Sequence, residues 1–274
     1  MSNNHATSRG VTTIELIVFM VVTAILTGLV FTALGDYYQA TVSSAARTMN
    51  TASNRTSLRT VQDDMTNVVG FLSSSPLTAQ APLGINNSAT AWQYGGSSAA
   101  QRVLIAQSNA TDKPPDDIDR MVVFKPNAGN CNISSAIPIQ VHSIYYVAPD
   151  AQVASQSNLY RRTIVESATT CPHPVTGAVS VPYQKTTCRT ASLAPVCQGN
   201  DALILTNVKS FSVDYFVNAS DQTPIPDIYL TITNPLTQAA VNSAAAIRLN
   251  LTTENKVEGK NETVTSTMRV ARKN

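Results

Sequence analysis

The stretch SRGVTTIELIVFMVVTAILTGLVFTALGDYY, residues 8–38, decides the fold of this chain. Within it, Glu15 is the only charged residue of a long apolar run, residues 11–34. An α-helix needs about 20 apolar residues to cross a bilayer, so the run predicts a membrane-spanning helix. A carboxylate at bilayer depth costs roughly 2.5–3.5 kcal/mol on insertion scales, so Glu15 needs a partner. No Lys, Arg or His lies within the run to supply one.

The ten residues before the run, MSNNHATSRG, suggest where a positive charge comes from. In a secretory signal peptide the apolar region precedes the cleavage site, whereas here a short polar leader comes first. A cut after Gly10 leaves the apolar run in place and gives Val11 a new α-amino group. This amine is four residues, about one helical turn, from Glu15. It can pair with Glu15 of the same subunit or, when subunits stack, with Glu15 of a neighbour.

Gly10 followed by VTTIELIVFMVVTAIL resembles the class III signal of type IV pilins and pseudopilins. The resemblance implies a leader over residues 1–10, cleavage between Gly10 and Val11 by a prepilin peptidase, and N-methylation of Val11. It also implies that Thr12 and Glu15 act in assembly. Val11 stands where phenylalanine is more usual. The alternative is an ordinary single-span anchor with an incidental glutamate.

The helix is predicted to continue beyond the membrane. Residues 36–72 contain no proline and one glycine, Gly70. Apolar residues recur at spacings of three and four, which is the period of an amphipathic helix. They form two sets, Val42, Ala45, Met49 and Ala52, then Leu58, Val61, Met65, Val68 and Leu72. We therefore predict one helix on the order of 90 Å long, with residues 11–34 in lipid or a filament core and residues 35–73 packed on a domain.

The remainder, residues 74–274, predicts a globular β-rich domain, which makes the fold class α+β. Residues 76–101 are rich in Pro, Gly, Ser and Asn and read as a long loop. A charged hairpin loop is expected over residues 254–262. Runs of branched and aromatic residues predict mostly antiparallel strands. These runs are 102–107, 120–126, 139–148, 158–166, 202–218, 227–235, 245–255 and 262–271.

The four cysteines form no CxxC motif. They are Cys131, Cys171, Cys188 and Cys197. An even number after a membrane-targeting start predicts two disulfides in an oxidising compartment. Three pairings are possible, and the sequence alone does not decide between them. We favour Cys188 with Cys197, which closes a short loop, and Cys131 with Cys171. Three of the four lie in an insertion over residues 167–200. Four reduced thiols are the alternative; a zinc site fits less well, because prolines flank His173.

Other features argue against catalysis and nucleic-acid binding. The 274 residues are only 13% charged with a net charge of +2, and no nucleotide-binding or hydrolase motif occurs. His142 reads as a strand-surface residue. Acidic groups at Asp63 and Asp64, and in the PPDDIDR turn at residues 114–120, read as solvated. Arg161 or Arg162, which face opposite sides of a strand, can touch an acidic partner. We expect no enzyme activity, no cofactor and no metal.

Motifs in the C-terminal half of the chain point to a particular subgroup of this family. HSIYYVA, NLYRR, LTNVKSFSVDYFV and the ending RVARKN resemble PilW-like minor pilins and J-type pseudopilins. The resemblance implies a structural subunit of a type IV pilus or a related secretion-type filament. Its partners would be other pilins, a prepilin peptidase, an inner-membrane assembly platform and membrane lipid. The precursor would lie in the inner membrane and the mature subunit in an extracellular or periplasmic filament.

Three alternatives stay open. The chain could be a major pilin, an adhesive tip subunit that binds through residues 76–101 or 167–200, or an extracytoplasmic membrane-anchored protein that does not polymerise. The sequence does not say whether such a filament would serve motility, DNA uptake or secretion.

Overall fold

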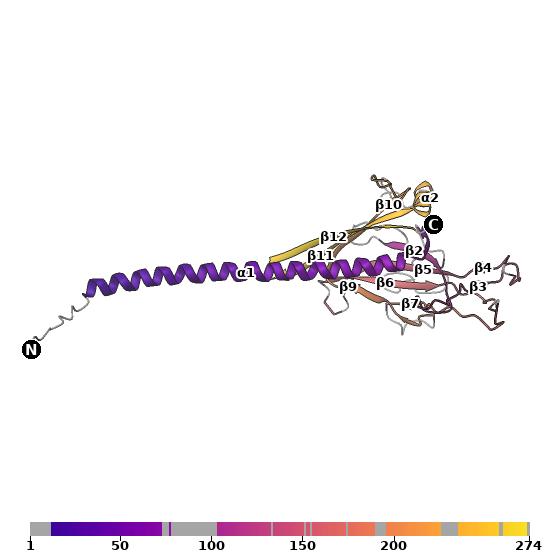
Figure 1. The fold of residues 1–274 in the computed structure, drawn as a ribbon, viewed down its shortest axis with the longest axis horizontal. Helices are drawn as coiled ribbons and strands as arrows, with labels where there is room; N and C mark the ends of the chain where they lie inside the picture. The colour runs from indigo at the N-terminus through magenta and orange to yellow at the C-terminus, as the bar shows by residue number, and fades with distance from the viewer. Residues whose placement is uncertain are drawn as a thin grey trace, which may run out of the picture.

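A long helix and a β domain packed on its second half make up the structure, a computed structural model (Figure 1). Helix α1 spans Thr13–Met65, 53 residues, and is about 80 Å long at 1.5 Å per residue. Its first half projects away from the domain. The α+β class is confirmed. The structure describes residues 12–72, 77, 103–132, 134–150, 152–153, 155–173, 175–189, 196–225, 235–257 and 260–272.

Two sheets build the domain. The larger has the order β1-β2-β5-β6-β9, with every neighbouring pair antiparallel. Its strands are Val68–Leu72, Leu104–Asn109, Gln140–Pro149, Ser157–Val165 and Ala202–Leu205. The smaller sheet has the antiparallel order β10-β11-β12. Its strands are Val208–Phe216, Ala246–Val257 and Lys260–Ala271.

Shorter elements complete the described chain. Helix α2 spans Pro235–Ser243 and contacts β1. Two small ribbons are formed by β3 with β4, which are antiparallel, and by β7 with β8, which are parallel. These strands are Phe124–Lys125, Ile137–Pro138, Thr187–Cys188 and Gly199–Asn200. The predicted strand over 227–235 and the loop over 76–101 fall almost wholly outside the described residues.

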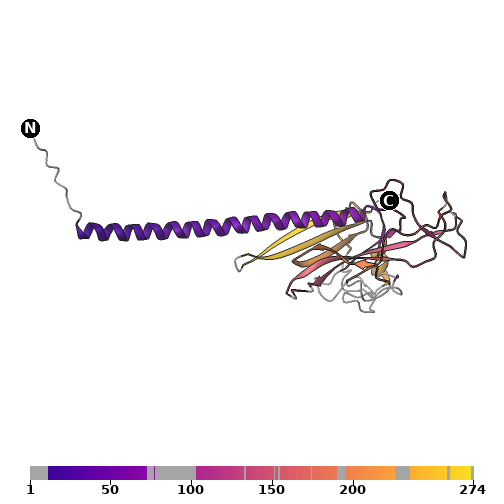
Figure 2. The same ribbon diagram turned by 90° about the horizontal axis from the view of Figure 1, so that it is seen from below.

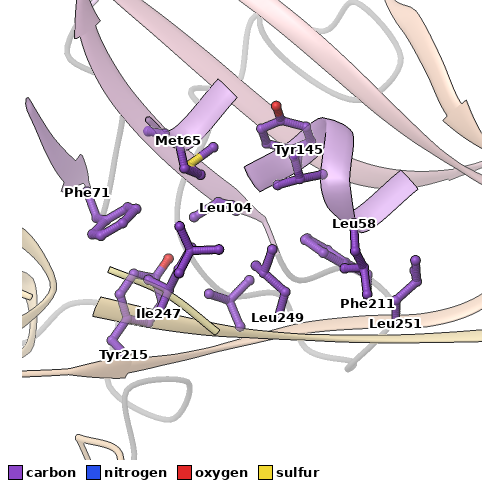
Figure 3. Close-up of a cluster of buried hydrophobic side chains, with 14 of the residues drawn as sticks. Leu58, Met65, Phe71, Leu104, Tyr145, Phe211, Tyr215, Ile247, Leu249 and Leu251 are labelled. Atoms are coloured by element: carbon purple, nitrogen blue, oxygen red, sulfur yellow. The ribbon is translucent and has the colours of Figure 1, made fainter. Parts of the chain in front are cut away.

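One core joins the helix to both sheets. Figure 3 shows side chains of β10 and β11 pointing toward those of α1, β2 and β5. The ring of Phe71 in β1 meets that of Tyr215 edge-on, with centroids 6.0 Å apart. The opposite face of the large sheet is buried as well, in a second cluster around Ile105, Ile144 and Ile164. Burial on both faces explains why the second half of β5, residues 144–148, is a continuous apolar run rather than an alternating one.

The predicted end of the helix near Leu72 is wrong. The helix ends at Met65, and residues Val68–Leu72 form β1, so the domain begins before residue 74. Val68 and Leu72 continue the helical spacing of the preceding residues, but Phe71 pairs with Ala106 in β2. Strand pairing with a distant segment overrides the local period here.

The long strand predicted over residues 202–218 is divided between the two sheets. β9 pairs with β6 in the large sheet, and β10 pairs with β11 in the small one. The crossing occurs at Asn207, whose φ of 57° is tolerated by asparagine better than by most residues. Its side chain donates to Asn255 Oδ1 at 2.6 Å, which ties the crossing to β11.

The charged hairpin loop predicted over residues 254–262 is also shorter than expected. β11 and β12 stay paired as far as Val257 and Lys260. The charges lie on the paired strands themselves, where Glu254 meets Lys209 and Glu262 meets Arg47. Together the two strands form a long hairpin that runs beside α1 (Figure 1).

The two predicted disulfides form with the favoured pairing. Cys131 bonds Cys171, 40 residues apart, and Cys188 bonds Cys197, nine residues apart. Each pair has a Cα–Cα separation typical of a disulfide, 5.4 and 5.5 Å. The first pair fastens the segment after β6 to the loop before β4, and the second closes the loop that joins β7 to β8.

Arg162 and Asp201 form a buried ion pair on the outer face of the large sheet. Their side chains are 0% and 1% exposed. The guanidinium donates from Nη2 to Asp201 Oδ2 at 2.7 Å and from Nε to both carboxylate oxygens. Asp201 also accepts from the hydroxyls of Tyr146 at 2.5 Å and Thr187 at 2.9 Å. The pair therefore connects β5 and β6 to β7, and Arg162 is not available to an external partner.

His142 is fully buried on the same outer face, so its prediction as a strand-surface residue is wrong. Burial disfavours the charged imidazolium and lowers its pKa to about 4, although nearby Glu166 acts in the opposite direction. The unfolded chain therefore binds a proton at a higher pH than the folded chain does. Consequently stability is retained above the unfolded pKa of about 6.5 and falls as the pH drops toward 4.

We expect this histidine to remove roughly 3 kcal/mol of unfolding free energy between pH 6.5 and pH 4. Chemical denaturation of the full chain in detergent, at a series of pH values, measures the slope. The His142→Asn variant should show a shallower slope over that interval than the wild type. Equal slopes would contradict the prediction.

Candidate functional site

The first turn of α1 carries the residues singled out at the start of the sequence. Thr12 is the N-cap, with an extended backbone, and its hydroxyl accepts from the Glu15 N–H at 3.3 Å. In return, Glu15 Oε2 accepts from the Thr12 N–H at 2.9 Å and from the Thr12 hydroxyl at 3.0 Å. This reciprocal capping box follows from the TTIE sequence, in which a threonine precedes a glutamate by three residues.

Glu15 is hydrogen-bonded in the single chain, but its charge has no cationic partner within the helix half that carries it. The first Lys, Arg or His after it along the chain is Arg47, 32 residues away. The helix dipole favours a negative charge at this end, by an amount small compared with the cost of burying a carboxylate in lipid. Gly10 and Val11 lie outside the described residues, so the cleavage and methylation there stay predictions.

The apolar half of α1 touches nothing in the described chain. Its large apolar side chains, from Ile14 to Leu34, are between 49% and 74% exposed. The helix is long and apolar enough to cross a membrane. The hydroxyls of Thr27 and Thr32 donate to carbonyls one turn earlier, at 2.7 and 2.9 Å, which makes them compatible with lipid. An apolar surface of this extent is unfavourable in contact with water.

The part of α1 that follows the apolar half along the chain turns its apolar stripe away from the β domain, toward solvent. Met49 is 71% exposed, and Ala45 and Ala52 are exposed as well. The prediction that these residues pack on the domain is therefore wrong. Tyr37 and Tyr38, 73% and 63% exposed, extend the exposed surface toward the apolar half. We call residues 37–52 on this side the outward stripe.

The domain instead holds this part of the helix through polar contacts. Ser43 donates to Glu262 Oε1 at 2.8 Å, and Arg47 donates to Glu262 Oε2 at 2.7 Å. Asn50 accepts from Asn255 in β11, and Asn54 donates to a carbonyl of β12 at 3.3 Å. Nothing local in the sequence marks these contacts, because each joins residues more than 200 positions apart. From Leu58 onward the helix face turns apolar, as predicted.

The helix end also carries an ion pair that no local pattern indicates. The prediction that Asp64 lies in a solvated face is wrong, because Asp64 accepts from Arg161 in β6 and from the hydroxyl of Tyr145 in β5. Asp63, its neighbour, is exposed as expected. In the PPDDIDR turn, Asp117 accepts from the Asp119 N–H at 2.9 Å, as in a solvated turn.

Within the part of the chain that the structure describes, no group of three or more His, Cys, Asp or Glu residues is placed to hold a metal ion. No family model matches the chain, and no curated protein or solved structure matches it.

Proposed function

We propose that the chain is a structural subunit of a pilin-like filament, a minor pilin or pseudopilin assembled through α1. One observation carries the proposal: the helix exposes an apolar surface that continues beyond the length of a bilayer. The apolar half, residues 13–34, is about 33 Å long and suffices to cross the hydrocarbon core. Met49 of the outward stripe lies about 22 Å further along the helix.

The outward stripe distinguishes a filament subunit from a simple anchor. Lipid around residues 13–34 accounts for the apolar half of either protein. An anchor that never polymerises leaves Met49 and Tyr38 in water, where exposed apolar area is unfavourable by about 25 cal/mol per Å² relative to burial. Packing of several copies of α1 side by side covers the apolar half and the outward stripe together.

The capping box supports the proposed assembly step. Glu15 sits at the tip of the helix, and the amine released by a cut after Gly10 would lie within about a turn of it. In a growing filament the amine of one subunit would meet Glu15 of another and offset its charge inside the apolar core. Processing would require a prepilin peptidase, and extraction from the inner membrane would require an assembly platform and other pilins.

Substitution of the acid tests this step. Glu15→Val should be inserted and cleaved normally, yet should be absent from filaments, because the apolar core then lacks the pairing group. Isolated surface filaments analysed by mass spectrometry report both subunit content and the mature N-terminus, which should be methylated Val11. Asp36→Asn, which changes an exposed acid just past the apolar half, is the matched control and should assemble.

Normal filaments from Glu15→Val would contradict the proposed step, and a functional protein that keeps Met1 would contradict the whole proposal. The same spectra give the abundance of the chain relative to other subunits. A low ratio supports a minor subunit, which the size of the β domain also favours, and a dominant ratio supports a major pilin.

A further inference from the structure

A polar groove of roughly 900 Å³ opens on the large sheet beyond the end of α1. The sheet strands β2, β5 and β6 form its floor, on the same face that the helix covers further back. The end of α1 forms one wall with Asp64 and Asn67, and the loop before β3 forms another with Arg120. The segment just before β7 contributes Gln184 and Lys185.

The floor changes from apolar to polar where the helix stops. Beneath the helix this face carries Leu104 and Leu159, which are fully buried in the core. In the groove the same three strands present mainly the half-buried Ser108, Ser143 and Thr163, with the apolar Val141 of β5 beside them. Ser143 and Thr163 lie directly opposite each other in the β5–β6 ladder, so their hydroxyls sit side by side.

One residue that lines the groove carries a hydrogen-bond donor without an acceptor. Arg161 gives its Nη1 to Asp64, but its Nε is buried and has no partner among the described residues.

The groove also carries cations that no carboxylate neutralises. Arg120 donates to the Pro115 carbonyl at 3.1 Å and to Asn67 Oδ1 at 3.3 Å, both neutral acceptors. Lys185 is exposed and forms no ion pair within the described ranges. Arg161 and Asp64 offset each other. The exposed Asp63 leaves the lining with a net charge of +1, from three cations and two anions.

These features select one class of ligand. Strands β2 and β5 have neighbours on both sides in the sheet, and beyond the pairing with β9 the N–H groups of Thr163 and Val165 in β6 donate to threonine hydroxyls. The groove therefore offers no free strand edge for an extended peptide. A single net charge is too small for nucleic-acid binding. Hydroxyls, amides and guanidinium groups match the hydroxyls and carboxylates of a sugar acid, and Tyr183, 51% exposed on the lining, offers an aromatic face to a pyranose ring.

We propose that this groove binds a short acidic oligosaccharide, with Arg120 and Lys185 facing its carboxylates and the Ser143 and Thr163 hydroxyls facing its ring hydroxyls. The proposal goes beyond the filament subunit role and does not depend on it, because the groove lies in the β domain of a single chain.

Titration calorimetry on the full chain in detergent tests the proposal, with tetragalacturonate as the probe. Lys185→Ala and Arg120→Ala should each weaken binding by about tenfold, the loss expected for one charged hydrogen bond. Ser143→Leu, which fills the floor, should abolish binding. Lys209→Ala removes the same charge from β10, outside the groove, and should bind like the wild type, as should Glu15→Val.

Two comparison ligands sharpen the test. Maltotetraose, which has the hydroxyls without the carboxylates, and tetraglutamate, which has the carboxylates without the sugar rings, should both bind much more weakly than tetragalacturonate. Lys185→Ala should leave folding intact, because the Lys185 side chain is exposed and makes no ion pair among the described residues. Equal binding of either comparison ligand, or unchanged binding of tetragalacturonate by Lys185→Ala, would overturn the proposal.

Discussion

Asp201→Ala is expected to lower the unfolding free energy of the chain by about 3–5 kcal/mol. The substitution leaves the Arg162 guanidinium fully buried without its counter-ion, and the desolvation cost of that charge is then uncompensated. It also removes the acceptor for the hydroxyls of Tyr146 and Thr187. Because Thr187 belongs to β7, that strand should loosen from β6 at the same time.

Denaturant unfolding of the full chain in detergent measures the loss of unfolding free energy. The Thr163 N–H donates to Thr187 Oγ1 at 2.9 Å, so its protection from hydrogen exchange reports whether β7 stays attached to β6. Lys209→Ala, which breaks the exposed pair with Glu254, is the control and should cost at most about 1 kcal/mol. The double variant Arg162→Met/Asp201→Leu should recover most of the loss, since no buried charge remains. A loss below that of the control would refute this account.

Removal of the longer disulfide should have an effect of similar size. The Cys131–Cys171 bond closes a loop of 40 residues, for which the chain-entropy relation gives about 4 kcal/mol. Replacing both cysteines by serine releases that restriction on the unfolded chain and should lower the denaturation midpoint accordingly. Denaturant titration of the double serine variant, beside the oxidised wild type, gives the difference.

The shorter disulfide provides the matched comparison. For Cys188–Cys197, with a separation of nine residues, the same relation gives about 3 kcal/mol, so its double serine variant should be the more stable of the two. The reverse order would show that native contacts around the bonds, and not the size of the closed loop, determine their contributions.

The features that could be predicted from the sequence are those fixed by nearby residues. Thr12 and Glu15 are three residues apart, and the helix begins between them with a reciprocal cap. The branched and aromatic runs that became β5 and β6 were placed to within two residues. The favoured cysteine pairing held because it joins cysteines only nine residues apart and leaves the other two for each other.

The features that were missed depend on distant partners. The end of α1 is decided by pairing of Phe71 with Ala106, and the outward direction of Met49 is decided by polar contacts from β11 and β12. His142 alternates with apolar residues as a surface residue would, but the large sheet is covered on both faces. The groove beyond α1 brings together side chains from the end of α1, three strands and two loops that are far apart in the sequence, so no local pattern predicts it.

The hairpin of β11 and β12 lies along α1 (Figure 2). It contacts the helix at successive points: Ser43 and Arg47 near the end of the hairpin, then Asn50 and Asn54, then the apolar core. These contacts are spread over about 33 Å of helix axis between Ser43 and Met65. Tension applied along that axis would load all of them at once, in shear, instead of opening them one after another as in unzipping. A fibre built from such subunits would transmit pulling force from helix to domain with high mechanical strength, even though few of the individual contacts are strong.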